Sequence, residues 1–161
     1  MKVISNSSPL INFTALGKLT LLRELYGTIT IPDAVYQEVV GGGQTQPGRI
    51  EVEQADWIVR ETVSNRTAIA ALHALGRGEA EAIVLGVENP SSLLVIDDRR
   101  GRLAAASMGV NIIGTLGVLL VAKRKSLVAA LAPEIEALQT HVGFRIQADL
   151  RIRILQEAGE E

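Results

Sequence analysis

Short aliphatic runs alternate with helical patterns along most of the chain, and this alternation constrains the fold more than any other feature of the sequence. The clearest run covers residues 93–96 (LLVI), which follow the turn-forming residues 89–92 (NPSS). Other strand-like runs cover residues 2–5, 28–31, 57–59 and 110–113, and helical patterns cover residues 8–16, 19–26, 33–40, 66–75, 79–87, 98–108 and 116–124. Strands and helices that alternate in this way predict an α/β fold: a three-layer α/β/α arrangement with a central parallel sheet.

The domain organisation follows from length and from the distribution of flexible residues. A chain of 161 residues fits one ordinary domain, so we expect a single domain over residues 1–161. Two further helices, at residues 127–139 and 146–158, are expected to pack on the core from about residue 127. The low-complexity segment at residues 41–48 (GGGQTQPG) is predicted to form a mobile loop or lid.

Composition excludes some kinds of chemistry and only weakly disfavours others. The chain has no cysteine, which rules out disulfides, thiolate metal sites and cysteine nucleophiles. Its formal net charge of −2 argues mildly against a general nucleic-acid binder. A small local patch could still contact phosphates, however, and an acidic catalytic cluster would itself lower the net charge. No signal peptide or membrane span is expected, so we predict a cytoplasmic protein.

Polar residues occur where strands end or where helices follow them. The first strand ends at Asn6, the helix after the second strand carries Glu38, the Gly-Arg-Gly turn at 76–78 precedes Glu79, and the strand at residues 93–96 ends at Asp97 and Asp98. In open α/β sheets, functional groups collect beyond the carboxyl ends of the strands. Clustered oxygen ligands are what Mg²⁺ or Mn²⁺ requires, and such ions support hydrolysis of phosphodiesters.

Each of these residues also has a purely structural interpretation. Asp97 and Asp98 could cap the helix that follows them, and Glu79 could favour the positive end of a helix dipole. Glu38 could be a solvated surface residue, and Asn6 a turn residue before Ser8 and Pro9.

Other charged residues near these positions are assigned by their spacing. Glu81 lies two residues after Glu79, so the two cannot face the same site from one helix. Arg99, Arg100 and Arg102 follow the acidic pair, where a substrate phosphate would approach, and are candidate RNA-binding residues. A solvated helix face is the simpler account of at least one of these three arginines.

Five segments, taken in order, resemble the PIN-domain family. Residues 3–11 (VISNSSPLI) resemble its opening strand and turn, and residues 31–39 (IPDAVYQEV) are similar to its second acidic segment. Residues 75–83 (LGRGEAEAI) and 94–102 (LVIDDRRGR) resemble the third and fourth acidic segments. Residues 114–117 (GTLG) match a run of one uncharacterised PIN-like subgroup. Each motif is weak alone, but the ordered set covers nearly the whole chain.

The resemblance implies a site, a cofactor and partners. It implies metal-site residues at Asn6, Glu38, Glu79 and Asp98, with Asp97 adjacent, and catalytic roles for Glu38, Glu79 and Asp98. It further implies supporting roles for Ser8 and Thr115. The implied activity is Mg²⁺- or Mn²⁺-dependent RNA cleavage, often as the toxin of a type II toxin–antitoxin pair. The implied partners are RNA and a small antitoxin protein, and a homodimer is expected because homodimers are common among soluble proteins.

Two alternatives to an active nuclease follow from the sequence. The family normally has Asp where this chain has Asn6, and an amide oxygen can bind a metal but brings no charge. The chain could therefore be a catalytically weakened PIN module that binds RNA or a partner protein. A nucleotide-binding α/β domain of another kind is disfavoured, because no glycine-rich phosphate-binding motif follows the first strand.

Overall fold

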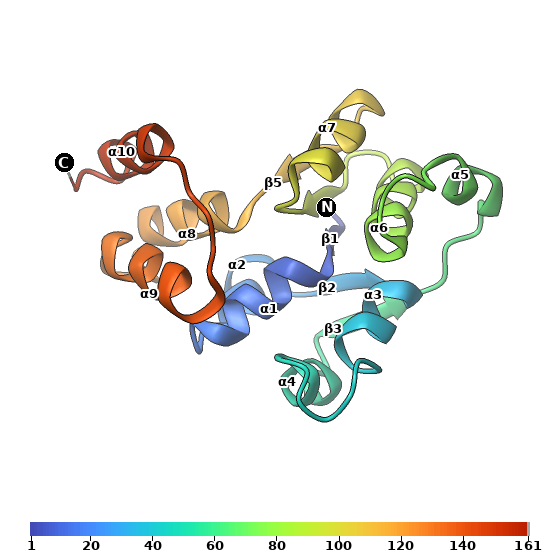
Figure 1. The fold of residues 1–161 in the computed structure, drawn as a ribbon, viewed down its shortest axis with the longest axis horizontal. Helices are drawn as coiled ribbons and strands as arrows, with labels where there is room; N and C mark the ends of the chain where they lie inside the picture. The colour runs from blue at the N-terminus through green and yellow to red at the C-terminus, as the bar shows by residue number, and fades with distance from the viewer. Residues whose placement is uncertain (161) are drawn as a thin grey trace.

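The computed structural model describes residues 1–160, and these residues form an α/β fold around a parallel sheet (Figure 1). Five strands lie in the order β3-β2-β1-β4-β5, and every neighbouring pair is parallel. Their bounds are β1 Val3–Ser5, β2 Ile29–Pro32, β3 Ile58–Glu61, β4 Leu93–Val95 and β5 Asn111–Ile113. The three-layer parallel architecture expected from the alternating pattern is confirmed.

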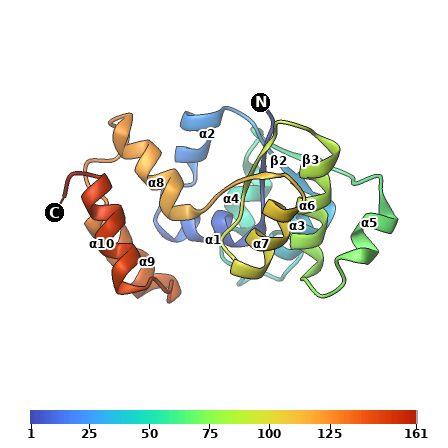
Figure 2. The same cartoon turned by 90° about the horizontal axis from the view of Figure 1, so that it is seen from above.

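The helices connect these strands and cover both faces of the sheet. They are α1 Ser7–Ala15, α2 Thr20–Tyr26, α3 Asp33–Val39, α4 Arg49–Gln54, α5 Arg66–Ala71, α6 Arg77–Glu88, α7 Arg99–Ser107, α8 Thr115–Arg124, α9 Ala132–Val142 and α10 Ala148–Glu157. Figure 2 shows α8, α9 and α10 together at one end of the molecule and α5 at the other.

Two hydrophobic clusters occupy the two faces of the sheet. Val3 and Val95 point into a cluster with α1, α8 and α9, while Ile4 and Leu94 point into a cluster with α6 and α7. Neighbouring residues of a strand face opposite sides, so aliphatic residues at successive positions bury a strand on both faces. This is why residues 93–96 read as a continuous aliphatic run.

Several element boundaries differ from the sequence-based prediction. The helix expected at residues 66–75 ends at Ala71, and the next one begins at Arg77 rather than at residue 79. The helix expected from residue 127 begins at Ala132. Its start is delayed because Ser126 has a left-handed backbone (φ 61°) and because proline is favoured in the first turn, where Pro133 lies. Residues 49–54, for which no helix was predicted, form α4 after the turns of residues 41–48.

Among residues 1–160, no helix is long and apolar enough to cross a membrane.

Candidate active site

One pocket lies beyond the carboxyl ends of the central strands and is lined by four of the five polar residues singled out in the sequence, all but Asp97. It has a volume of about 200 Å³ and is lined by Asn6, Ser7, Ser8, Glu38, Gly76, Glu79 and Asp98. The expectation that Asn6, Glu38, Glu79 and Asp98 converge is therefore confirmed by the geometry. They come from four places in the fold: the end of β1, α3, the first turn of α6 and the start of α7.

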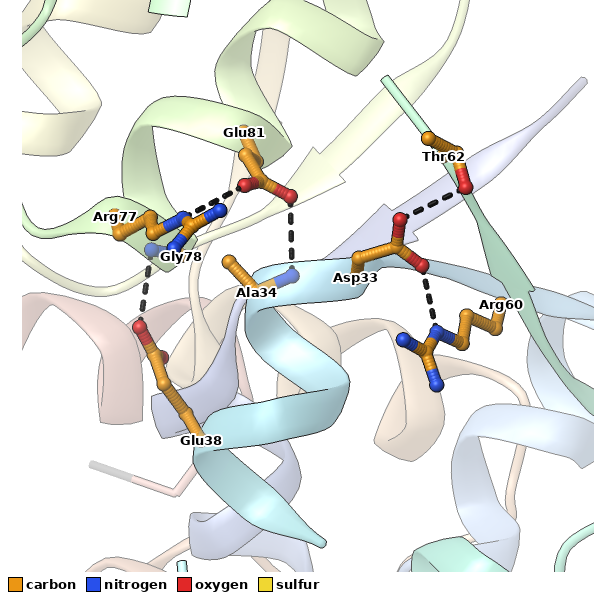
Figure 3. A network of polar contacts seen from close by, with 8 residues as sticks. All are labelled: Asp33, Ala34, Glu38, Arg60, Thr62, Arg77, Gly78 and Glu81. Carbon is orange, nitrogen blue, oxygen red and sulfur yellow. Dashed lines mark hydrogen bonds and ion pairs between the residues drawn. The ribbon is translucent and has the colours of Figure 1, made fainter. Parts of the chain in front are cut away.

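The Glu38 carboxylate is held by two donors. Its Oε1 accepts a hydrogen bond from the backbone N–H of Gly78 at 3.0 Å, and its Oε2 accepts one from the Ser7 hydroxyl. Figure 3 shows Glu38 reaching from α3 to the start of α6. A Cβ at position 78 would lie 2.5 Å from the Glu38 carboxylate, so any residue other than glycine there would displace this carboxylate.

A second carboxylate joins the same two helices in the opposite direction. Glu81 of α6 is buried, and its Oε1 accepts a hydrogen bond from the backbone N–H of Ala34 at the start of α3. Its Oε2 accepts one from Arg77 Nε at 3.2 Å (Figure 3). Glu81 therefore fixes α3 against α6 and, as expected from its spacing, does not line the pocket.

One carboxylate oxygen of Glu79 accepts a hydrogen bond at the start of α6, and the other has no hydrogen-bond partner within residues 1–160. As the third residue of α6, it accepts a long hydrogen bond of 3.3 Å at Oε1 from the Gly76 N–H, a common arrangement at helix N-termini. Its Oε2 is buried and has no hydrogen-bond partner among the described residues. Burial raises the pKa of Glu79, and the negative charge of the nearby Asp98 carboxylate raises it further.

Asp98 caps α7, as its alternative structural interpretation proposed. Its Oδ2 accepts a hydrogen bond from the Gly101 N–H at 3.0 Å, and the residue is exposed toward the pocket. Gly101 also lies close to the site, because a Cβ there would be 2.8 Å from Glu79 Oε2. Capping and lining the pocket are compatible roles for one carboxylate.

Asn6 occupies the end of β1 and is only 4% exposed. Its backbone N–H continues the pairing with β4 through Val95 O at 3.0 Å. Its side chain makes no capping bond to α1, and Oδ1 is buried without a partner in the described part of the chain. A turn residue would be expected to use that oxygen locally, so the turn interpretation leaves this atom unexplained.

Asp97 belongs to a different network. Its carboxylate accepts hydrogen bonds from the Thr115 backbone N–H (2.7 Å), the Thr115 hydroxyl (2.5 Å) and Asn12 Nδ2 (3.0 Å). It lines a separate cavity of about 400 Å³ next to α10, outside the pocket of Asn6 and Glu79. Thr115 thus supports Asp97, and Asp97 ties α8 and α1 to the end of β4.

Of the three arginines of α7, two are exposed and one makes a structural hydrogen bond. Arg99 and Arg100 are exposed beside Asp98. Arg102 is half-buried, and its guanidinium donates a hydrogen bond to the backbone oxygen of Ile96 at 2.9 Å.

The sequence analysis missed four residues that shape the site: Ser7, Asn12, Gly78 and Gly101. The two glycines carried a usable signal, because each lies in the first turn of a helix beside a candidate carboxylate, where glycine lowers helix stability.

Comparison with known families identifies the group to which this site belongs. The model of the PIN-domain family DUF3368 matches residues 2–160. The chain belongs to the PIN-domain family. No curated protein and no solved structure matches this PIN domain. PIN domains have a nuclease-like fold and are generally metal-dependent.

The residues of this PIN domain fit a loosely held divalent ion. Among residues 1–160, no three Asp, Glu or His side chains form a cluster that could hold a metal by themselves. Mg²⁺ commonly binds through one or two carboxylates, several waters and substrate phosphates, and does not need such a cage. The adjacent carboxylates of Glu79 and Asp98, together with the unpartnered oxygens Asn6 Oδ1 and Glu79 Oε2, match that donor set.

Proposed function

We propose that this PIN domain is a Mg²⁺- or Mn²⁺-dependent endoribonuclease. The observation that carries the proposal is a pair of buried oxygens without donors, Asn6 Oδ1 and Glu79 Oε2, in a pocket lined by three carboxylates. Buried oxygens without partners are unfavourable unless something else satisfies them. A cation would satisfy both and would relieve the repulsion that raises the pKa of Glu79.

In this proposal, Asn6, Glu79 and Asp98 would hold the ion, and Glu38 would add negative charge to the same pocket. A bound divalent ion supplies charge neutralisation at the scissile phosphate and lowers the pKa of a coordinated water. Glu38 is held by Ser7 and Gly78, so its carboxylate keeps a fixed position in the pocket. Arg99 and Arg100, exposed beside Asp98, would contact the RNA backbone.

The biological role proposed is that of the toxin in a type II toxin–antitoxin pair acting in the cytoplasm. This rests on the resemblance of the ordered acidic segments to toxin ribonucleases. A small antitoxin protein would be the inhibitor, and a homodimer the functional form.

Cleavage of RNA with added Mn²⁺ tests the proposed activity. We expect Asp98→Asn to retain the helix cap, since Asn caps as well as Asp, but to cleave about a hundredfold more slowly because it lacks the charge. Asp56→Ala is the control, because Asp56 is exposed and lies before the edge strand β3, at its amino end, whereas the pocket lies beyond the carboxyl ends of the central strands. Equal cleavage by the wild type and Asp98→Asn would refute the assigned site.

A second candidate function is a weakened module that binds RNA or a partner protein. Two observations favour it: the uncharged Asn6, and the lack of a three-residue metal cluster among residues 1–160. RNA binding without cleavage at any Mg²⁺ or Mn²⁺ concentration would select this function over the first.

A further inference from the structure

A second cavity, separate from the proposed active site, lies between α5 and α6. Its volume is about 490 Å³. Cationic and aliphatic side chains line it together: Arg66, His73 and Arg77 around Ile69, Leu72 and Leu75, with Ala70, Ala80 and Glu81 completing the wall. Ile69, Leu72 and Leu75 pack against the hydrophobic cluster that includes α6, yet none of them is fully buried, so part of each aliphatic side chain remains accessible in the cavity.

The cavity adjoins the pocket through a single turn. Arg77 lines the cavity, while its neighbour Gly76 lines the active-site pocket and Gly78 holds Glu38. Figure 3 shows Arg77 beside Gly78 at the start of α6, on the side away from Asp33. A chain bound at the pocket would therefore reach the cavity within a short distance along the first turn of α6.

The accessible charge of this cavity is positive, although the whole chain carries a net charge of −2. Glu81 is the one acidic residue in the lining, and its side chain is 6% exposed and bonded by Ala34 and Arg77. The Arg77 side chain remains 75% exposed, so its terminal amino groups face solvent. Arg66 and His73 are exposed as well.

We propose that this cavity is a subsite for one nucleotide of single-stranded RNA that flanks the scissile phosphate. Arg66 and Arg77 contact its phosphate, and the base lies against Ile69, Leu72 and Leu75. Single-stranded RNA is bound by cationic groups that follow its backbone together with apolar surfaces that accept its bases. The inference rests on the proposed function, since it takes the neighbouring pocket as the place of cleavage.

RNA binding by variants of the cavity tests this subsite. Affinities for an RNA hexanucleotide and a dinucleotide are measured in a Glu79→Gln background, so that cleavage does not interfere. We expect Arg66→Gln to weaken binding of the hexanucleotide several-fold and to lower the salt slope by about 0.7, the value for one lost phosphate contact on a single strand. Binding of the dinucleotide, which is too short to fill both sites, should not change.

The matched control is Arg153→Gln, which removes an exposed arginine from α10 at the far end of the molecule and should leave both affinities unchanged. Arg77→Gln should act like Arg66→Gln. The Arg66 side chain makes no hydrogen bond among residues 1–160, and its backbone N–H bonds Ser64 O, a bond that glutamine would keep, so the replacement is not expected to disturb the fold. The base contact is tested with a hexanucleotide that lacks the base at the flanking position. Loss of this base should weaken binding to the protein with the unaltered cavity. It should weaken binding less in the double variant Arg66→Gln/Leu72→Ser, whose cavity has already lost part of its apolar wall.

Failure of this inference can be separated from failure of the proposed function. Cleavage that depends on Asp98, combined with hexanucleotide binding that ignores Arg66 and Arg77, would overturn the subsite and leave the nuclease. Hexanucleotide binding that depends on both arginines, without any cleavage, would support the subsite and select the RNA-binding module. An equal loss of affinity in Arg153→Gln would show only general electrostatic attraction and would overturn the subsite.

Discussion

The carboxylates of the pocket combine a structural role with a chemical one, residue by residue. Glu38 and Glu79 accept N–H groups at the start of α6, and Asp98 accepts one at the start of α7. Helix N-termini stabilise negative charge, which helps the fold keep three carboxylates close together without a cation. Asn6 differs from them because its side-chain oxygen caps no helix and has no hydrogen-bond partner among residues 1–160.

Asn6→Asp tests whether the side-chain oxygen of Asn6 is a metal ligand. If Asn6 is a metal ligand, the added charge should tighten Mn²⁺ binding and speed cleavage at low metal concentration. It should also destabilise the metal-free protein through repulsion with Glu79 and Asp98, by roughly 1–3 kcal/mol for a charge placed in a buried site. Calorimetric titration with Mn²⁺ and thermal unfolding in a chelator measure the two effects.

The matched control is Asn111→Asp, which adds the same charge at the exposed start of β5, at the other edge of the sheet. It should change neither metal affinity nor cleavage. If Asn6→Asp behaves like this control in both assays, Asn6 is not part of a metal site.

At the scale of elements, the site depends on the close approach of helix N-termini to the pocket carboxylates. Gly78 lets the start of α6 approach the Glu38 carboxylate, and Gly101 lets α7 approach Glu79. The pair of bonds from Glu38 to Gly78 and from Glu81 to Ala34 sets the position of α3 against α6. Glu38 and Glu79 lie within helices, and Asn6 and Asp98 directly precede α1 and α7, so helices position all four of these residues.

Gly78→Ala should displace the Glu38 carboxylate without destabilising α6. Alanine favours a helix by about 0.5–1 kcal/mol over glycine, but its Cβ would lie 2.5 Å from the Glu38 carboxylate. We expect cleavage to fall by about tenfold or more while the folded state is retained, since misplacing a catalytic group by about 1 Å has large effects on rate.

The comparison for this variant is Gly86→Ala, in the same helix, where a Cβ would contact only Val110 and Ser92 on the core side. That substitution should lower stability by about 1–3 kcal/mol through overpacking and leave the activity of the folded protein unchanged. Undiminished cleavage by Gly78→Ala would contradict the role assigned to Glu38.

Elements of this fold were predictable where the pattern is repetitive, and details of the site were not. The aliphatic run at 93–96 predicted a buried strand ending beside Asp98, and polar residues at strand ends and on the following helices predicted one pocket. The sequence could not distinguish the roles of neighbouring residues. Asp97 and Asp98 look equivalent in sequence, yet Asp97 bonds Thr115 and Asp98 caps α7. That difference depends on which element packs behind the end of β4, which spacing alone does not reveal.

At the scale of the whole molecule, one carboxylate adds polar bonds to the apolar packing of the C-terminal helices. Glu160 accepts hydrogen bonds from the backbone N–H groups of Leu131 and Ala132 and from Lys123, whose ammonium also bonds Ala158 O. The end of the chain thereby joins the start of α9 to α8. Burial would raise the pKa of Glu160, but the bonds from Leu131, Lys123 and Ala132 outweigh it and lower the pKa from 4.5 to about 2.

The stability of the C-terminal helices should therefore depend on pH. Because the folded pKa is depressed, Glu160 contributes stability above pH 4.5, and this contribution is lost as the pH falls from 4.5 toward about 2. At pH 7, Glu160→Gln should reduce the free energy of unfolding by about 1–3 kcal/mol through weakened charged hydrogen bonds. Denaturant unfolding of both proteins should show this difference shrinking in acid.

Glu157→Gln is the matched control for this prediction. Glu157 pairs with Arg124 at 3.8 Å, and both side chains are about 60% exposed, so its loss should matter by less than about 0.5 kcal/mol. A difference between wild type and Glu160→Gln that stays constant from pH 7 to pH 2 would contradict the role of the Glu160 charge.

A metal ion bound at the pocket should stabilise the whole molecule, because α3, α6, α7 and the end of β1 all contribute to it. A ligand that binds only the folded state adds RT ln(1 + [L]/Kd), which is about 1.4 kcal/mol at a concentration ten times Kd. For a chain of this size that corresponds to a rise in Tm of about 3–6 °C. Millimolar Mg²⁺ and Mn²⁺ should each produce such a rise in Tm. The rise should be lost in Asp98→Asn and kept in Asp56→Ala.

The rise in Tm should also depend on pH, because the ion neutralises the charges that raise the pKa of Glu79. It should be larger at pH 8 than at pH 4, where Glu79 retains its proton. An unchanged Tm at both pH values, or an equal rise in Asp98→Asn, would mean that the pocket is not where the ion binds.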